Sequence, residues 1–114
     1  MNYDELTVEA KQFLLTFYKA YYEKMKNGES RDGARKFSDI YEVHNQYFSD
    51  WSFNTALDIV NELSRKGWLD NLYGDNVPVF ITLKTESIAQ LQQRFSKGTK
   101  QILSELTKLK NLFA

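Results

Sequence analysis

The sequence predicts a mostly helical α+β fold in which two short helices, joined by a tight turn, are followed by a β-hairpin. The first observation is a helical repeat of apolar residues over 52–66 that ends at Gly67. The second is a change of period after that glycine, because residues 68–69 and 77–83 are rich in β-branched and aromatic side chains. Two helices joined by about four residues form a helix-turn-helix, around which the rest of the chain is arranged.

Length and composition limit the class of protein. The chain has 114 residues, enough for one domain, and 42% of them are hydrophobic. No apolar run approaches the roughly 18 residues of a membrane span, and acidic residues stand where a signal peptide would be basic. There is no cysteine, and therefore no disulfide or thiolate zinc site. We expect a cytosolic protein without membrane contact, with a main domain over residues 1–95 and an amphipathic helix over 96–114.

The N-terminal part predicts a long first helix. Asp4 is a suitable N-cap, with Tyr3 and Val8 placed as a hydrophobic staple, and Thr7 is an alternative cap for a later start. An aromatic-rich apolar stripe then continues to Gly28, where the helix would end. Aromatic rings bury large areas without any ligand, so core packing is favoured over a ligand pocket for this stripe.

The next segment leads into the helix-turn-helix. Residues 28–36 contain two glycines and five charged side chains, and we expect a solvated polar loop. Phe37 would form a short outer strand beside the hairpin, and Ser38 would cap a helix over residues 39–47. The inward face of that helix would carry Ile40, Val43, His44 and Tyr47.

The second helix of the pair has two distinct faces. Its apolar stripe consists of Phe53, Ala56, Leu57, Val60 and Leu63. If this stripe centres on Val60, the opposite, solvent-facing side carries Trp51, Asn54, Thr55, Asp58, Glu62 and Arg65. Gly67 would end the helix in a left-handed conformation, and the residues 72–76 that follow supply the tip of the hairpin.

Two more helices are expected after the hairpin. Thr85 can cap a helix over residues 86–95 that turns Ile88, Leu91 and Phe95 inward. Gly98 interrupts the pattern, and residues 99–114 form the last helical segment. Its apolar seam, with alternating four- and three-residue spacing, consists of Ile102, Leu106, Leu109 and Phe113. This seam would either pack on the first helix or pair with a second copy in a homodimer.

Charge is unevenly distributed along the chain, although the formal net charge is zero. Residues 38–83 hold two basic and seven acidic side chains, net −5, whereas residues 84–114 hold six basic and two acidic side chains, net +4. Nucleic-acid-binding domains usually carry a basic excess. Here the predicted helix-turn-helix and hairpin are acidic, and the C-terminal part is basic.

Parts of this pattern resemble a known superfamily. The passage over residues 56–69, with its SRKGWL motif, resembles the recognition-helix-to-wing passage of winged helix-turn-helix proteins, and KTESIAQL at 84–91 resembles the helix that follows the wing. The short chain with a basic, amphipathic last helix is similar to small Gram-positive, phage-associated proteins of the YjcQ type, although Ser87 replaces their usual glycine. The superfamily resemblance covers residues 37–95 and implies a recognition helix in the DNA major groove and a wing on the backbone or minor groove.

Two functions are compatible with these features. In the first, the chain is a small transcriptional regulator that binds duplex DNA through Asn54, Thr55, Arg65 and Asn76, while basic residues of the tail or the 28–36 loop neutralise phosphates. In the second, a protein partner is bound by Trp51, Asp58, Ile59, Glu62 and Tyr73, because aromatic side chains often anchor interfaces. The resemblance favours DNA, whereas Asp58 and Glu62 would bring negative charge toward phosphates.

Catalytic, metal and cofactor sites are not expected. His44 is the one histidine and lies on the inward side of its helix, where a hydrogen-bonded role at the edge of the core is commoner than a catalytic one. The sequence has no glycine-rich phosphate loop and no HExxH metal pair. Residues 70–75 lack the spacing and the final glutamate of a calcium loop. We therefore expect a binding protein rather than an enzyme.

Overall fold

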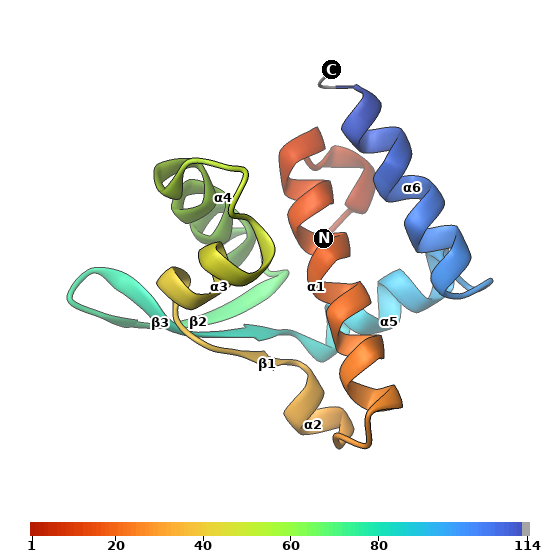
Figure 1. Ribbon diagram of the computed structural model, residues 1–114, viewed down its shortest axis with the longest axis horizontal. Coiled ribbons are helices and arrows are strands. Elements are labelled where there is room, and N and C mark those ends of the chain that lie inside the picture. Colours follow the sequence, from red (N-terminus) through yellow and green to blue (C-terminus); the bar gives the residue numbers. More distant parts are fainter. Residues whose placement is uncertain (113–114) are drawn as a thin grey trace.

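The computed structural model describes residues 1–112 and has an α+β architecture with six helices and one three-stranded antiparallel sheet in that part of the chain (Figure 1). This confirms the mostly helical α+β class. The elements in order are a 3-10 helix η1 (Tyr3–Glu5), α1 (Val8–Lys26), α2 (Arg31–Ala34), β1 (Lys36–Phe37), α3 (Ile40–Tyr47), α4 (Phe53–Arg65), β2 (Leu69–Gly74), β3 (Val77–Leu83), α5 (Thr85–Arg94) and α6 (Thr99–Asn111).

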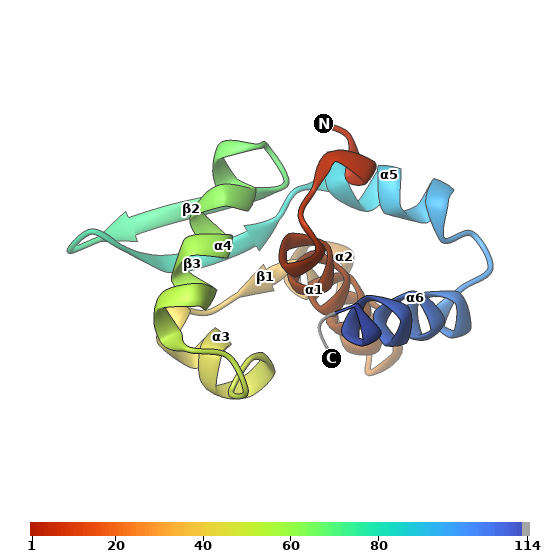
Figure 2. The ribbon, with the colours of Figure 1, turned by 90° about the horizontal axis from the view of Figure 1, so that it is seen from above.

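Helix α1 is the centre of the molecule. Figures 1 and 2 show α3, α4 and the hairpin on one side of it and α5 and α6 on the other. Phe13 stacks on Phe48 at 3.8 Å between ring centroids, and Phe17 stacks on Phe37 at 4.2 Å. The aromatic stripe of α1 is therefore core packing, as predicted.

The sheet has the order β1-β3-β2. Leu69 pairs with Leu83 at the base of the hairpin, and Gly74 pairs with Val77 at its tip. Asp75 and Asn76 form the connection with φ values of +52° and +68°, which are the positive angles of a two-residue type I′ turn. The hairpin and the short outer strand that the sequence predicted are both confirmed.

Gly67 ends α4 in the way that the sequence predicted. Its φ is +86°, a left-handed conformation that costs glycine little because it has no Cβ. The Trp68 amide donates to the Leu63 carbonyl at 2.9 Å, and the Gly67 amide donates to the Ser64 carbonyl at 3.1 Å. This pair of bonds is a Schellman motif, which satisfies the last carbonyls of α4 and turns the chain into β2.

Three helices begin at another residue than the first cap predicted for them. At α1 the alternative cap Thr7 is the one used, with its Oγ1 accepting from the Ala10 amide, while Asp4 pairs with Arg94 across 2.6 Å. The interruption lies at Leu6, which is extended and buried. Asp39 caps α3 instead of Ser38, and its carboxylate accepts from the Glu42 amide at 2.9 Å. At α5, the cap position is taken by Lys84 and not Thr85, without a side-chain bond.

The segment expected to be a polar loop contains one helical turn, α2. Ser30 caps this turn by accepting from the Gly33 amide at 3.0 Å. Asp32 Oδ1 lies 2.9 Å from Arg35 Nη2, and Asp32 Oδ2 lies 3.0 Å from Lys36 Nζ. Three of the charges expected to be free in solvent therefore form a local cluster. Hydrogen bonds from Lys36 and Arg35 hold the pKa of Asp32 below its ordinary value.

The C-terminal helix folds back on α1. Ile102 and Leu109 are buried, and Leu106 packs against the core, so these residues of the seam are used within the chain rather than left open for a second copy. Phe113 lies outside the described residues. Helix α5 turns Ile88, Leu91 and Phe95 into the core as predicted. None of the helices within residues 1–112 has both the length and the apolar character needed to cross a bilayer.

Candidate nucleic-acid interface

The start of α4 is fixed by hydrogen bonds in the turn that precedes it. Ser52 Oγ accepts from the Thr55 amide at 3.1 Å and donates to Thr55 Oγ1 at 2.8 Å. His44 Nε2 lies 2.7 Å from the carbonyl oxygen of Trp51. Because a carbonyl oxygen can only accept, this nitrogen carries the proton, and the ring ties α3 to the turn. His44 therefore has a structural role here, at the edge of the core.

The buried face of α4 is rotated from the predicted one. Ala56, Ile59, Val60 and Leu63 are buried, whereas Phe53 and Leu57 are only partly covered. Ile59 was expected to be an exposed interaction residue, and this prediction is wrong, because only 7% of it is exposed. The physical reason is that α4 packs on both α1 and β2, so that its covered surface is wider than a single stripe.

The solvent-facing side of α4 carries one line of polar side chains. Asn54, Asp58, Asn61 and Arg65 are spaced by four, three and four residues, which places them in a row along the helix. Asn54, Asp58 and Arg65 are exposed, and Asn61 is partly buried. Thr55 is exposed beside this row at the first turn. Three predicted DNA contacts thus lie on one helix, Asn54 and Thr55 in its first turn and Arg65 at its last residue.

Glu62 does not belong to that exposed row. Its side chain is 25% exposed, and its Oε2, which solvent does not reach, lies 3.5 Å from Lys66 Nζ without hydrogen-bond geometry. The prediction that Glu62 stands beside Asp58 in the middle of the solvent-facing side is therefore wrong. The wider contact of α4 with its neighbours covers it. Within α4, Asp58 is the one carboxylate left to oppose an approaching phosphate.

The hairpin is bonded to α4 by two side chains. Tyr73, which is 47% exposed, donates from its hydroxyl to Asn61 Oδ1 at 2.7 Å. Asn71 Nδ2 donates to the Val60 carbonyl at 3.3 Å, while Asn71 Oδ1 is buried without a partner. These contacts were not predicted, although the position of Asn61, seven residues after Asn54, was a usable signal for the row.

The tip and the outer face of the hairpin have no positive charge. The chain carries no lysine or arginine between Gly67 and Leu83. Asn76 is exposed at the tip, away from the row on α4, where its positive φ serves the turn. On the outer face, Leu72 and Phe80 pair directly across the strands and are 61% and 59% exposed. This pair is a small apolar surface that the prediction missed.

Trp51 is less open than the sequence suggested. It is partly buried, and its ring centroid lies 5.3 Å from that of Phe48 and 6.1 Å from that of Phe13. The indole therefore covers the edge of the aromatic core and keeps one side exposed. This arrangement is not that of a free interface anchor.

Basic residues lie at both ends of the row rather than along it. Arg65 and Lys66 stand at the C-terminal end of α4. At the other end, Lys110 of α6 lines a hollow together with Ser52 and Thr55. Arg35 and Lys36 lie on the β1 side, where both pair with Asp32. The C-terminal part thus supplies one lysine to the start of α4.

Two further observations concern metal binding and similarity to known proteins. Within residues 1–112, no three histidine, cysteine or acidic side chains come together in a group that could hold a metal ion. Comparisons with protein-family models, with curated proteins and with solved structures found no match to this chain.

Proposed function

We propose that this chain is a winged-helix DNA-binding protein in which α4 is the recognition helix and the β2–β3 hairpin is the wing. The observation that carries the proposal is the exposed row of Asn54, Asp58 and Arg65 on a helix that follows a tight turn and precedes a hairpin. Helices of this kind enter the major groove with side chains of the row facing base edges.

The row has the chemistry for base readout. A guanidinium such as that of Arg65 donates two hydrogen bonds to guanine, and the amide of Asn54 can pair with adenine. The carboxylate of Asp58 accepts from the amino group of cytosine but repels phosphates. Each well-made pair contributes about 1–3 kcal/mol of discrimination between bases. We therefore expect contacts with base edges to contribute more to the binding free energy than contacts with the DNA phosphates.

Phosphate contacts are few in this proposal. Lys66 and Lys110 flank the row, Arg65 is its last member, and the hairpin adds no cation. Each neutralised phosphate contributes about 0.9 to the slope of log affinity against log salt for duplex DNA. We therefore expect weak binding to random duplex and a slope of about three or less.

The test is fluorescence anisotropy of a labelled random duplex at roughly 50 mM salt. Arg65→Ala should weaken binding, and Asp58→Asn should strengthen it because repulsion of the phosphates is removed. Glu29→Gln removes the same charge at the exposed end of α1 and is the matched control. Absence of binding by both the native chain and the Asp58→Asn variant would contradict the proposal, as would an equal gain from Glu29→Gln.

A second candidate, a protein-interaction module, is favoured by the outer face of the hairpin. Leu72 and Phe80 lie side by side and are both more than half exposed. Buried apolar residues surrounded by polar ones are typical of interface centres. Asp70 and Lys36 line a hollow together with Leu72 and Phe80, so the rim of this surface is polar and carries both signs of charge.

Site-specific photo-crosslinking in cells tests this second candidate. A photoreactive amino acid in place of Leu72 should give a discrete crosslinked protein that is absent when the same amino acid replaces Glu29. Equal patterns at the two positions, or none at either, would argue against a protein partner on this face.

A further inference from the structure

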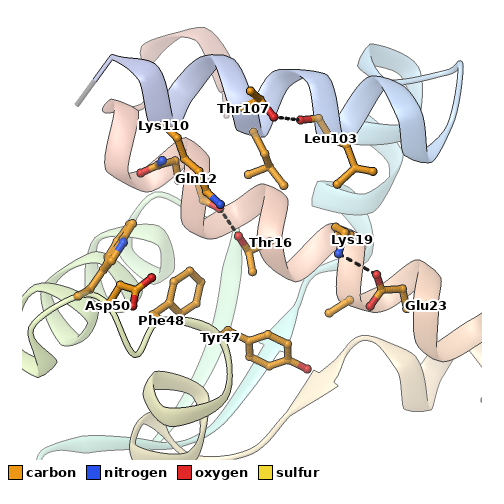
Figure 3. A pocket seen from close by; sticks show the side chains of 13 residues that line it. Gln12, Thr16, Lys19, Glu23, Tyr47, Phe48, Asp50, Leu103, Thr107 and Lys110 are labelled. Carbon is orange, nitrogen blue, oxygen red and sulfur yellow. Dashed lines mark hydrogen bonds and ion pairs between the residues drawn. The ribbon is translucent and has the colours of Figure 1, made fainter. Parts of the chain in front are cut away.

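A groove lies where α1, the turn after α3 and α6 meet (Figure 3). It consists of two hollows of about 300 Å³ and 510 Å³, which share Gln12, Asp50, Trp51 and Lys110. Volumes from about 300 Å³ upward are typical of small-molecule sites. The groove is therefore large enough for a compact organic ligand.

Gln12 is a nearly buried polar side chain in this groove. Only 6% of the residue is exposed, and its side-chain amide makes no hydrogen bond to any other residue within 1–112, although its backbone carbonyl accepts from Thr16 at 2.8 Å. The amide atoms themselves remain in contact with solvent. Because Gln12 lines both hollows, its amide presents a donor and an acceptor side by side to whatever occupies the groove.

The remaining walls define the charge and shape that would fit. Trp51 keeps one side of its indole open, and Phe48 and Tyr47 continue the aromatic wall in the smaller hollow. Burial, together with nearby carboxylates, raises the pKa of Tyr47, so its phenol stays neutral.

Carboxylates outnumber cations in the larger hollow. Glu9 and Asp50 face one cation, Lys110, and in the smaller hollow Lys19 is paired with Glu23 at 2.8 Å. A multiply charged anion would be repelled by this arrangement. The groove therefore suits an uncharged, planar molecule with adjacent hydrogen-bond donor and acceptor groups.

We propose that this groove binds a purine nucleoside of the adenine type. The Gln12 amide pairs with the amino group and ring nitrogen on one edge of the base, the geometry by which glutamine recognises adenine. The face of the base lies against Trp51, because aromatic rings stack on bases. The Asp50 carboxylate accepts hydrogen bonds from the ribose hydroxyls, as acidic residues do in other nucleoside sites.

The bound nucleoside would touch the first turn of α4. Ser52 and Thr55 line the larger hollow beside Gln12, and Ser52 is the N-cap of that helix. Binding at this position can be measured without DNA, so the proposal does not depend on the DNA-binding function.

The test is a titration of the full chain with adenosine, followed by calorimetry and tryptophan emission. Trp68 is 1% exposed, so the emission change should come from Trp51 and should disappear in Trp51→Phe. Adenosine should bind saturably, and ATP should bind at least about tenfold more weakly because of its charge. Guanosine should also bind more weakly, since the corresponding edge of its base offers two acceptors and no donor.

Variants distinguish a specific adenosine site from non-specific binding. Gln12→Leu and Gln12→Glu should each weaken adenosine binding by about tenfold, the effect of losing a paired amide. Gln46→Leu, on the exposed surface of α3, should not change it. Two Gln12 variants are used because one of them can alter folding, which thermal unfolding would reveal. No saturable adenosine binding, equal binding of ATP, or equal loss in Gln46→Leu would overturn the proposal.

Discussion

The hydroxyl of Tyr73, on the hairpin, donates a hydrogen bond to Oδ1 of Asn61, on α4, across 2.7 Å. Two residues earlier on the same strand, Asn71 donates to the carbonyl of Val60 on the same helix. These bonds join the middle of the hairpin to the middle of α4. The row on α4 and the outer face of the hairpin therefore keep a fixed orientation, which a surface that binds a rigid partner needs.

Removing the Tyr73 hydroxyl should loosen this connection. Tyr73→Phe keeps the ring and deletes the donor, so we expect the free energy of unfolding to fall by about 1 kcal/mol. Tyr41→Phe is the control, because Tyr41 is 55% exposed and its hydroxyl bonds to no residue within 1–112. Urea denaturation of both variants measures the difference. Equal stabilities would show that the bond contributes nothing.

The turn of the hairpin should be improved by glycine. Asn76 has a φ of +68°, and an Asp-Gly pair is favoured over Asp-Asn in a type I′ turn. We expect Asn76→Gly to raise the free energy of unfolding by about 0.5 kcal/mol, since relief of the left-handed strain exceeds the entropy lost with glycine. Asn27→Gly, at a φ of −86°, should instead lower it. Thermal unfolding checks both signs, and a loss in Asn76→Gly would refute the turn assignment.

Ser87 should stabilise the junction between α4, the hairpin and α5. Its hydroxyl is fully buried and donates to the Trp68 carbonyl at 2.7 Å. Ser87→Ala should cost about 1 kcal/mol, and Ser87→Gly about 2 kcal/mol, because glycine also weakens the helix. Ser104→Ala, exposed on α6, should change stability by less than about 0.5 kcal/mol. An unchanged free energy of unfolding in Ser87→Gly would mean that the hydroxyl is dispensable.

The cluster around Asp32 should make stability depend on pH. Its pKa is lowered in the folded chain by hydrogen bonds from Lys36 and Arg35, so its contribution is present above the ordinary value of 3.8 and is lost as the pH falls below it. Asp32→Asn should therefore be less stable than the native chain at pH 7, and the two should converge toward pH 3. Urea denaturation across this range measures the difference in free energy of unfolding between the two chains. A difference that does not change with pH would contradict the stabilising role of the Asp32 carboxylate.

The sequence predicted elements whose signals are local. The change of period after Gly67, the tip of the hairpin and the inward residues of α5 depend on neighbouring residues alone, and the structure agrees with each of them. The choice of cap among adjacent residues was less reliable, as Asp39 shows in place of Ser38. Adjacent polar residues such as Ser38 and Asp39 carry the same capping signal, so the start of a helix is predictable only to within one or two positions.

Features that depend on tertiary contact could not be predicted. Ile59 and Glu62 were assigned to solvent from a single helical wheel, but α4 packs against α1, α3 and β2. A wheel has no information about how many elements surround a helix. The bond between Asn61 and Tyr73 joins residues of two different elements, and the surroundings of the Gln12 amide depend on the elements packed around α1. No sequence period marks either feature.

The most direct test of the central claim, that the exposed row of α4 meets DNA, is an amide NMR titration of the full chain with a short duplex at low salt. We expect the largest shifts at Asn54, Asp58 and Arg65, with little change on α5, which lies on the other side of α1 (Figure 2). Shifts confined to α5 and α6, or no shifts in the presence of excess duplex, would contradict the account.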